Sequence, residues 1–130
     1  MAAETKAGRG YIYVEMTIKD PEGFKQYTAL SAPAVHAAGG RYLVRGARPE
    51  FLEGSAEANR ITIVEFDTVE HAREFYHSAA YQAARKKRLS AAEFRMTLLE
   101  GPAVALSPEA VFAGRLSTPA RPETAAGGGM

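Results

Sequence analysis

Charged side chains interrupt several apolar, strand-like segments, and their types suit proton transfer or anion binding. Glu15 and Glu65 stand within alternating segments, where a charge is costly unless it is paired or hydrated. The alternation predicts that Arg41 and Arg45 share one face of a strand, with Arg95 on another strand. An arginine can hold a carboxylate or enolate oxygen and a glutamate can move a proton. The pattern indicates either a polar end to an apolar cavity or a structural network of ion pairs, which is the more common arrangement.

Tyrosine, serine and histidine side chains supply the remaining candidate groups. Tyr13 and Tyr76 would shape a cavity and Ser78 would add a donor, although a tyrosine on a helix stripe is usually a core residue. No activated-serine motif surrounds Ser78, so nucleophilic catalysis has no support. His36 is the candidate proton carrier besides Glu65, because an imidazole titrates near neutral pH.

The histidines do not form a recognisable metal-binding motif. His71 and His77 lie six residues apart, so they do not share a helix face as ligands four residues apart would. His77 is the one candidate for an axial haem ligand, and an exposed histidine at a helix end is the more common alternative. We predict that the protein has no metal and no cofactor.

Composition excludes several classes of function. The chain has 130 residues, a formal net charge of +1 and no cysteine. One domain is expected at this length, and the balanced charge gives no field that would attract nucleic acid or an anionic membrane. Disulfides and thiolate metal sites are excluded, and neither a secretory signal nor a membrane span is evident. We therefore expect a cytoplasmic protein with no nucleic-acid and no membrane partner.

The elements that must position these residues follow from the hydrophobic periodicity. Helices are predicted from Pro21 to Gly39 and from Thr68 to Leu89, with a kink or restart at Pro33 and a break at His77-Ser78. Period-two alternation predicts four strands, Tyr11–Ile18, Arg41–Gly46, Arg60–Phe66 and Glu93–Leu99.

The resulting order is β-α-β-β-α-β, an α+β, ferredoxin-like fold with a four-stranded antiparallel sheet. We expect a flexible N-terminus over residues 1–10, this domain over 11–101 and a mostly flexible C-terminal extension over 102–130. Both helices lie on one sheet face, yet the strands carry apolar groups on both faces. An exposed apolar patch usually marks an interface, so we predict a homodimer that pairs through its sheet faces.

Several short motifs also occur in the order of a known family. They are Asp20-Pro21, Tyr27, the run Gly39-Gly40-Arg41-Tyr42-Leu43-Val44-Arg45-Gly46, Leu52-Glu53-Gly54, Arg60 with Val64-Glu65-Phe66, Ala72 with Phe75-Tyr76, and Ser78 with Tyr81. On these residues the chain resembles the dimeric α+β-barrel superfamily, and within it a bacterial family named only as a domain of unknown function, number thirteen-thirty. Ala47, Asp67 and Phe75 depart from its pattern.

The resemblance implies a dimer with a cavity between sheet and helices, and it implies no activity. Relatives in the superfamily include cofactor-free monooxygenases, lactone isomerases and haem-binding peroxidase-like enzymes, and analogy at that level does not assign a function.

RNA-recognition domains share this element order. They need a Lys/Arg-Gly-aromatic signature on the third strand, which Arg60–Phe66 lacks. The cluster Arg85-Lys86-Lys87-Arg88 wraps around a helix, so we expect a solvated helix end.

Two hypotheses remain. The first is a small-molecule-binding dimer, and an isomerase or monooxygenase-like enzyme without a cofactor acting on a small apolar carbonyl compound is its catalytic form. Arg45 would hold an oxyanion, and Glu65 or His36 would carry a proton. The second is a non-catalytic accessory or assembly protein with no ligand.

Overall fold

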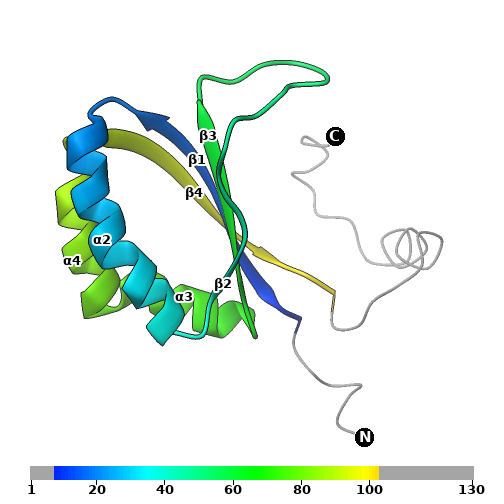
Figure 1. Cartoon of the computed structure of the whole chain (residues 1–130). Coiled ribbons are helices and arrows are strands. Elements are labelled where there is room, and N and C mark those ends of the chain that lie inside the picture. Colours follow the sequence, from blue (N-terminus) through cyan, green and yellow to red (C-terminus); the bar gives the residue numbers. More distant parts are fainter. Residues whose placement is uncertain (1–7, 103–130) are drawn as a thin grey trace, which may run out of the picture.

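One antiparallel sheet carries all of the helices on a single face in the computed structural model, which describes residues 8–102 (Figure 1). The strands are β1 (Gly10–Ile18), β2 (Arg41–Ala47), β3 (Arg60–Phe66) and β4 (Ala92–Glu100), in the spatial order β2-β3-β1-β4. The helices are α2 (Pro21–Ala37), α3 (Val69–His77) and α4 (Ala79–Arg88). The predicted ferredoxin-like α+β fold is confirmed. The N-terminal segment to residue 7 and the extension from residue 103, both expected to be flexible, lie outside the described residues.

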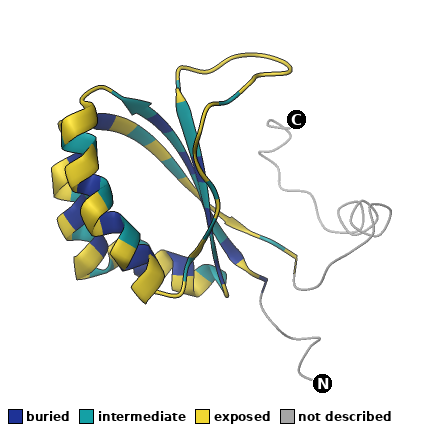
Figure 2. Ribbon diagram, viewed as in Figure 1, coloured by how far each residue is buried: buried dark blue, intermediate teal, exposed yellow. Residues whose placement is uncertain are grey.

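Alternation along the central strands separates the two faces of the sheet. Ile12, Val14 and Met16 of β1 are buried toward the helices, as are Val64 and Phe66 of β3. The residues between them are less buried, so buried and half-buried positions alternate along these strands (Figure 2). Their side chains point to the face that the helices leave open. Period two in the sequence thus becomes one core-facing side and one open side.

Helix α2 begins at Pro21, whose fixed backbone angle and missing N–H suit a first helical position. Asp20 occupies the N-cap position without a hydrogen bond from its side chain. The helix continues as one element through Pro33 to Ala37, so of the kink or restart expected at Pro33 the restart does not occur. Gly39, at φ 81°, then turns the chain into β2. None of the helices between residues 8 and 102 is long and apolar enough to cross a bilayer.

Two hydroxyl side chains divide the second helical segment at the predicted break. Thr68 caps α3, because its Oγ1 accepts a hydrogen bond from the His71 backbone N–H at 3.0 Å. Ser78 caps α4 in the same way, accepting from the Tyr81 N–H at 3.1 Å. The Ser78 hydroxyl also donates to the Phe75 carbonyl oxygen at 2.7 Å. Ser78 therefore has a structural role at the junction of α3 and α4.

The helical layer touches the sheet closely only at its α3 end. A Cβ placed on Gly10 would lie 2.5 Å from the Thr68 carbonyl oxygen and 2.6 Å from the Val69 Cα, so β1 and the start of α3 are in backbone contact. Ala72, with no exposed surface, continues this close packing. Helices α2 and α4 pack on each other, and their backbones stay farther from the sheet (Figure 1). Side chains must therefore fill the wider space between the sheet and helices α2 and α4.

An irregular register in β2 reverses the faces of its side chains. Arg41 pairs with Glu65 and Val44 with Ile63, with a register shift after Tyr42. Because an extra residue flips every following side chain, Arg41 lies on the open face whereas Arg45 lies on the helix side. The Arg45 guanidinium carbon sits 4.4 Å from the centroid of the Tyr42 ring. The prediction that Arg41 and Arg45 share a face is wrong for this reason.

Replacing Gly10 with alanine should cost about 1–3 kcal/mol of unfolding free energy, because the added methyl group overpacks a backbone contact that cannot rotate away. Urea denaturation measures this loss. Gly39→Asn is the matched control: open space surrounds Gly39, and asparagine tolerates its left-handed conformation. An unchanged midpoint for Gly10→Ala would contradict the close approach of α3 to β1.

Candidate functional site

A cavity of about 370 Å³ lies between the helix-facing side of the sheet and α2. We call it the inner cavity. Its walls are mostly apolar, and they come from all four strands and all three helices. The lining residues are Ile12, Val14, Met16, Ile18, Phe24, Tyr27, Thr28, Ser31, Val35, Tyr42, Arg45, Gly46, Arg60, Thr62, Val64, Phe75, Tyr81, Phe94 and Met96. A concave apolar site with few polar groups is typical of small-molecule binding.

Two tyrosine hydroxyl groups meet in the wall of the inner cavity. Tyr27 of α2 and Tyr81 of α4 are buried, and their hydroxyl oxygens lie 3.0 Å apart. Burial raises the pKa of both phenols, and their proximity to each other raises that of Tyr27 further. Both groups are therefore neutral at physiological pH. Two hydroxyls that share one hydrogen bond keep a second proton for another acceptor. The Tyr81 hydroxyl oxygen lies 3.5 Å from the Met96 Sδ, a weak acceptor that a ligand oxygen could replace.

Two smaller hydroxyls add polar character to the apolar lining. Thr62 of β3 is buried, and its Oγ1 accepts a hydrogen bond from the Gly46 backbone N–H at 2.8 Å. Because that contact uses an acceptor site, the Thr62 hydroxyl retains its proton as a donor. Ser31 of α2, only 4% exposed, stands on the same helix face as Tyr27. Hydroxyl groups that can donate a hydrogen bond therefore make up most of the uncharged polar groups in the lining.

Two arginines stand at the β2–β3 end of the inner cavity. Arg45 is exposed and lies over the Tyr42 ring, an arrangement that restrains its guanidinium. Arg60 is half-buried, and its Nη1 donates to the Asn59 carbonyl oxygen at 2.9 Å. Neither forms an ion pair with another residue between 8 and 102. A positive end on an apolar cavity favours ligands that carry a partial or full negative charge.

The described lining of the inner cavity contains no aspartate, glutamate or histidine. Within residues 8–102, no three such side chains gather closely enough to hold a metal ion. With its tyrosines protonated, the lining offers donors and a positive charge but no general base. The cavity can bind a carbonyl oxygen and stabilise negative charge on it.

The open face of the sheet holds a second set of predicted site residues. Arg95 Nε lies 3.4 Å from Glu15 Oε1, so these two side chains form an ion pair between neighbouring positions of β4 and β1. Tyr13 lies opposite Ile63 on one side and Thr97 on the other. These side chains face away from the helices and do not reach the inner cavity.

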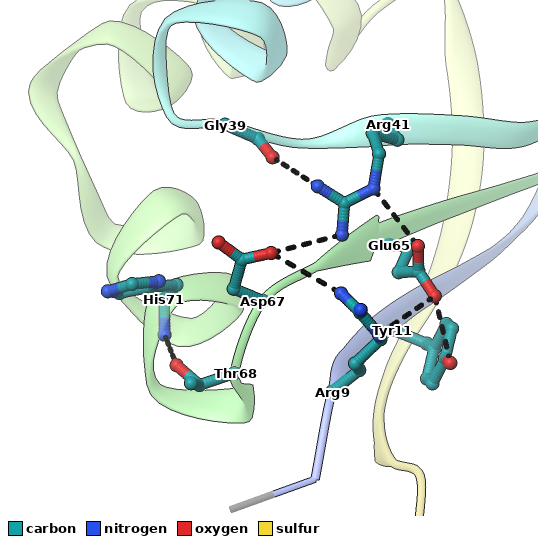
Figure 3. A network of polar contacts seen from close by, with 8 residues as sticks. All are labelled: Arg9, Tyr11, Gly39, Arg41, Glu65, Asp67, Thr68 and His71. Carbon is teal, nitrogen blue, oxygen red and sulfur yellow. Dashed lines mark hydrogen bonds and ion pairs between the residues drawn. The ribbon is translucent and has the colours of Figure 1, made fainter. Parts of the chain in front are cut away.

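Glu65 is the centre of a polar network at the other end of the open face (Figure 3). Arg41 Nε donates to Glu65 Oε1 at 3.0 Å, and the Tyr11 hydroxyl donates to Glu65 Oε2 at 3.0 Å. Arg9 Nε lies 3.9 Å from the same carboxylate, and Asp67 bridges both arginines at 3.4 and 3.2 Å. Desolvation works to raise the pKa of Glu65, but the hydrogen bonds from Arg41 and Tyr11 hold it below its ordinary value. Glu65 is ionised and committed to these partners.

The other predicted site residues lie elsewhere. His36 is exposed in the last turn of α2, and Ser78 is the cap between α3 and α4. Tyr76 is half-buried against the core and lines a different groove, together with His77. Of the residues singled out from the sequence as a site, only Arg45 lines the inner cavity. The sheet separates the inner cavity from Glu65, Tyr13, Glu15 and Arg95.

The sequence did not predict that the hydroxyl groups of the inner cavity lie together. Tyr27 and Ser31 recur at helical spacing on α2, which marks them as inward-facing. Ser31 could have been recognised as a cavity residue because it places a hydroxyl on an otherwise apolar helix face. Nothing local to the sequence brings Tyr81, 54 positions from Tyr27, into contact with it.

Comparisons with known proteins agree with this architecture. The model of a family described as a domain of unknown function (DUF1330) matches residues 9–102. No sequence among the curated proteins matches the chain.

Solved structures with the same fold include proteins from bacteria and a plant. A protein of unknown function from Rhodopseudomonas palustris, RPA0582, is 20% identical with a TM-score of 0.62, covering 79% of this chain and 86% of its own. SnoaB of Streptomyces nogalater, described as a cofactor-independent oxygenase, is 12% identical with a TM-score of 0.55 over 74% and 95%. A hypothetical protein of Arabidopsis thaliana is 16% identical with a TM-score of 0.54 over 82% and 100%. At these identities the likeness establishes the fold.

Glu65→Gln should make the free energy of unfolding depend less on pH in the acid range. A carboxyl whose folded pKa is depressed stabilises the fold fully above its unfolded pKa, about 4.3, and this stabilisation disappears as the pH falls through the lower folded pKa. The variant should therefore be less stable than wild type at neutral pH, with the difference shrinking below about pH 5.

Urea midpoints measured between neutral and acid pH test this dependence. Glu22→Gln, which removes an exposed carboxylate that pairs with Lys25 on the same helix, is the control and should change the profile little. A gap between wild type and Glu65→Gln that stays constant with pH would show that the network does not hold Glu65 ionised.

Proposed function

Because this chain belongs to the family described as a domain of unknown function (DUF1330), whose description assigns no activity, we propose a function from the inner cavity itself. The protein binds a small apolar molecule with a carbonyl oxygen there, as a homodimer paired through the open sheet faces. A cytoplasmic location is part of the proposal and is supported by the absence of cysteine.

The observation that carries the proposal is the neutral Tyr27–Tyr81 pair in an apolar cavity. A buried polar group is favourable only when its hydrogen-bonding capacity is used, and the pair retains a proton beyond the one it shares. A carbonyl oxygen accepts such a proton, and the surrounding aliphatic and aromatic walls take up the rest of the molecule. The volume of about 370 Å³ falls within the range of small-molecule sites.

The same donors allow a catalytic form of the proposal. Tyr27, Tyr81 and Arg45 would stabilise an enolate better than its parent carbonyl, as differential stabilisation of developing charge requires. Isomerase or monooxygenase-like chemistry without a cofactor would pass through such an anion, and SnoaB is described as a cofactor-independent oxygenase. Because the lining supplies no base, a substrate of this site must itself be acidic. Glu65 and His36, considered earlier as proton carriers, lie outside the cavity.

The homodimer is supported by the composition of the open face. Tyr13, Val44 and Ile63 are neighbours at its centre, with Ile61 and Leu99 nearby. Ion pairs flank this apolar centre at both ends, through Glu15 and Glu65. An apolar core with a polar rim is the usual anatomy of a protein interface.

Acetophenone and ethylbenzene form a matched pair of probes for the inner cavity, because they differ in the carbonyl oxygen. Acetophenone should bind wild type about five- to tenfold more tightly, the effect of one hydrogen bond. The double variant Tyr27→Phe/Tyr81→Phe removes both hydroxyls and should bind the two compounds equally. Ligand-induced rises in melting temperature give the affinities.

Filling the cavity provides the control for location. Ser31→Leu should abolish binding of both compounds, whereas Ala29→Leu, on the exposed side of α2, should not. If neither probe stabilises wild type, the proposal of a carbonyl ligand fails and the accessory protein without a ligand is favoured.

Ile63→Asp should separate the dimer into monomers. A charge at the centre of the open face should weaken association at least about 30-fold, equivalent to about 2 kcal/mol. Sedimentation of wild type and variant at micromolar concentrations measures this effect, with Leu52→Asp, 89% exposed, as the control. A wild-type monomer at those concentrations would refute the homodimer.

A further inference from the structure

A second concave site, separate from the inner cavity, lies along the edge strand β4. This outer groove has a volume of about 650 Å³ and is bounded by α3, α4 and β4. It shares only Ile12, Phe94 and Met96 with the inner cavity, so these side chains form the wall between the two. The further lining residues are Ala72, Arg73, Tyr76, His77, Arg85, Arg88, Leu89, Ala92, Glu93, Thr97 and Leu98.

Arg88 is the unusual member of the outer groove because it is a buried cation. Its side chain lies in the last turn of α4 and is only 6% exposed, so the expected solvated helix end is wrong for this residue. The guanidinium carbon sits 4.2 Å from the centroid of the Phe94 ring. Of its four-residue basic run, Arg88 and half-buried Arg85 line the groove, whereas Lys86 and Lys87 are exposed.

The two arginines are incompletely satisfied within the described chain. The Nε atoms of Arg85 and Arg88 are buried and have no hydrogen-bond partner. No ion pair among residues 8–102 involves either residue. The stacking on Phe94 and the C-terminal end of α4 both favour a cation, but neither gives these N–H groups an acceptor. A buried charge without a counter-charge is costly, so the site is chemically incomplete.

Neighbouring polar groups do not neutralise these arginines. Glu93, the one acidic residue of the groove, lies 2.7 Å from Lys19 Nζ through its Oε2. Glu70 forms an ion pair with Arg73, with 2.7 Å between Glu70 Oε2 and Arg73 Nη1. The Tyr81 hydroxyl also lies near Arg88, yet burial keeps that phenol neutral despite the opposing effect of the guanidinium. The groove therefore carries net positive charge.

The outer groove also has a large apolar part. Phe94, Met96 and Leu98 line it along β4, and Leu89 contributes a side chain that is 56% exposed. Leu98 is also exposed, at 36%. Large apolar side chains beside a buried guanidinium match a molecule with an anionic head and an apolar body.

We propose that the outer groove binds a small amphipathic carboxylate, whose head group bonds to Arg88 and Arg85 and whose apolar body covers Phe94, Met96 and Leu98. The carboxylate supplies the counter-charge that neither guanidinium has within residues 8–102. This site is independent of the carbonyl ligand in the inner cavity, so either proposal can fail without the other.

Isothermal titration of the full chain with octanoate tests the site, with 1-octanol as the uncharged probe of equal chain length. The titrations use the Ser31→Leu background as well as wild type, so that the inner cavity is filled. Octanoate should bind both proteins equally. Arg85→Gln should raise its dissociation constant at least about tenfold and leave that of 1-octanol unchanged, as expected for loss of a charge-assisted hydrogen bond.

Lys87→Gln removes the same charge from an exposed position of α4 and should change octanoate binding by less than about twofold. Arg88→Gln should weaken binding as well, and circular dichroism checks its folding. If Arg85→Gln and Lys87→Gln weakened octanoate binding equally, the effect would come from the overall charge of the helix and not from a specific contact. That result would overturn the proposal. Loss of binding in Ser31→Leu would place octanoate in the inner cavity, and absence of binding to wild type would also refute the outer site.

Discussion

The close contact between β1 and the start of α3 is the constraint on which the rest of the structure depends. Only a residue without a side chain at position 10 permits it, because the backbone of Thr68 and Val69 occupies the space where a Cβ would lie. The helical layer is fixed to the sheet at that end and diverges from it toward α2 and α4. The inner cavity lies in the space that this divergence leaves, and the outer groove lies beside it between α3, α4 and β4.

The sheet also separates two kinds of chemistry. Ionised carboxylates lie on the open face, where Glu15 and Glu65 each have an arginine partner. The inner cavity on the helix side holds neutral phenols and two arginines, Arg45 and Arg60, that form no ion pair within residues 8–102. Donors without a base can bind and polarise an oxygen, but they cannot remove a proton from carbon. This asymmetry favours ligand binding over acid–base catalysis by the side chains of the inner cavity.

Much of the fold was predictable because it depends on local patterns. Alternation predicted the four strands, and local residue types predicted a second helical segment that starts at Thr68 and breaks at His77-Ser78. The candidate site was less predictable, since it depends on register and long-range contacts. One register shift in β2 moved Arg45 to the side opposite Arg41, and the Tyr27–Tyr81 pair joins two distant helices. The burial of Arg88 could not be predicted from the sequence, because four consecutive cations point in all directions around a helix. Only the packing of the helix decides which one faces inward.

Native mass spectrometry of the full chain, purified without denaturation, tests whether one sheet face pairs with a second copy while the other retains a ligand. We expect a dimer whose mass exceeds that of two chains by a discrete small molecule, and we expect this molecule to be absent when Ser31→Leu fills the inner cavity. A monomer with the mass of the chain alone would contradict both the homodimer and the retained ligand.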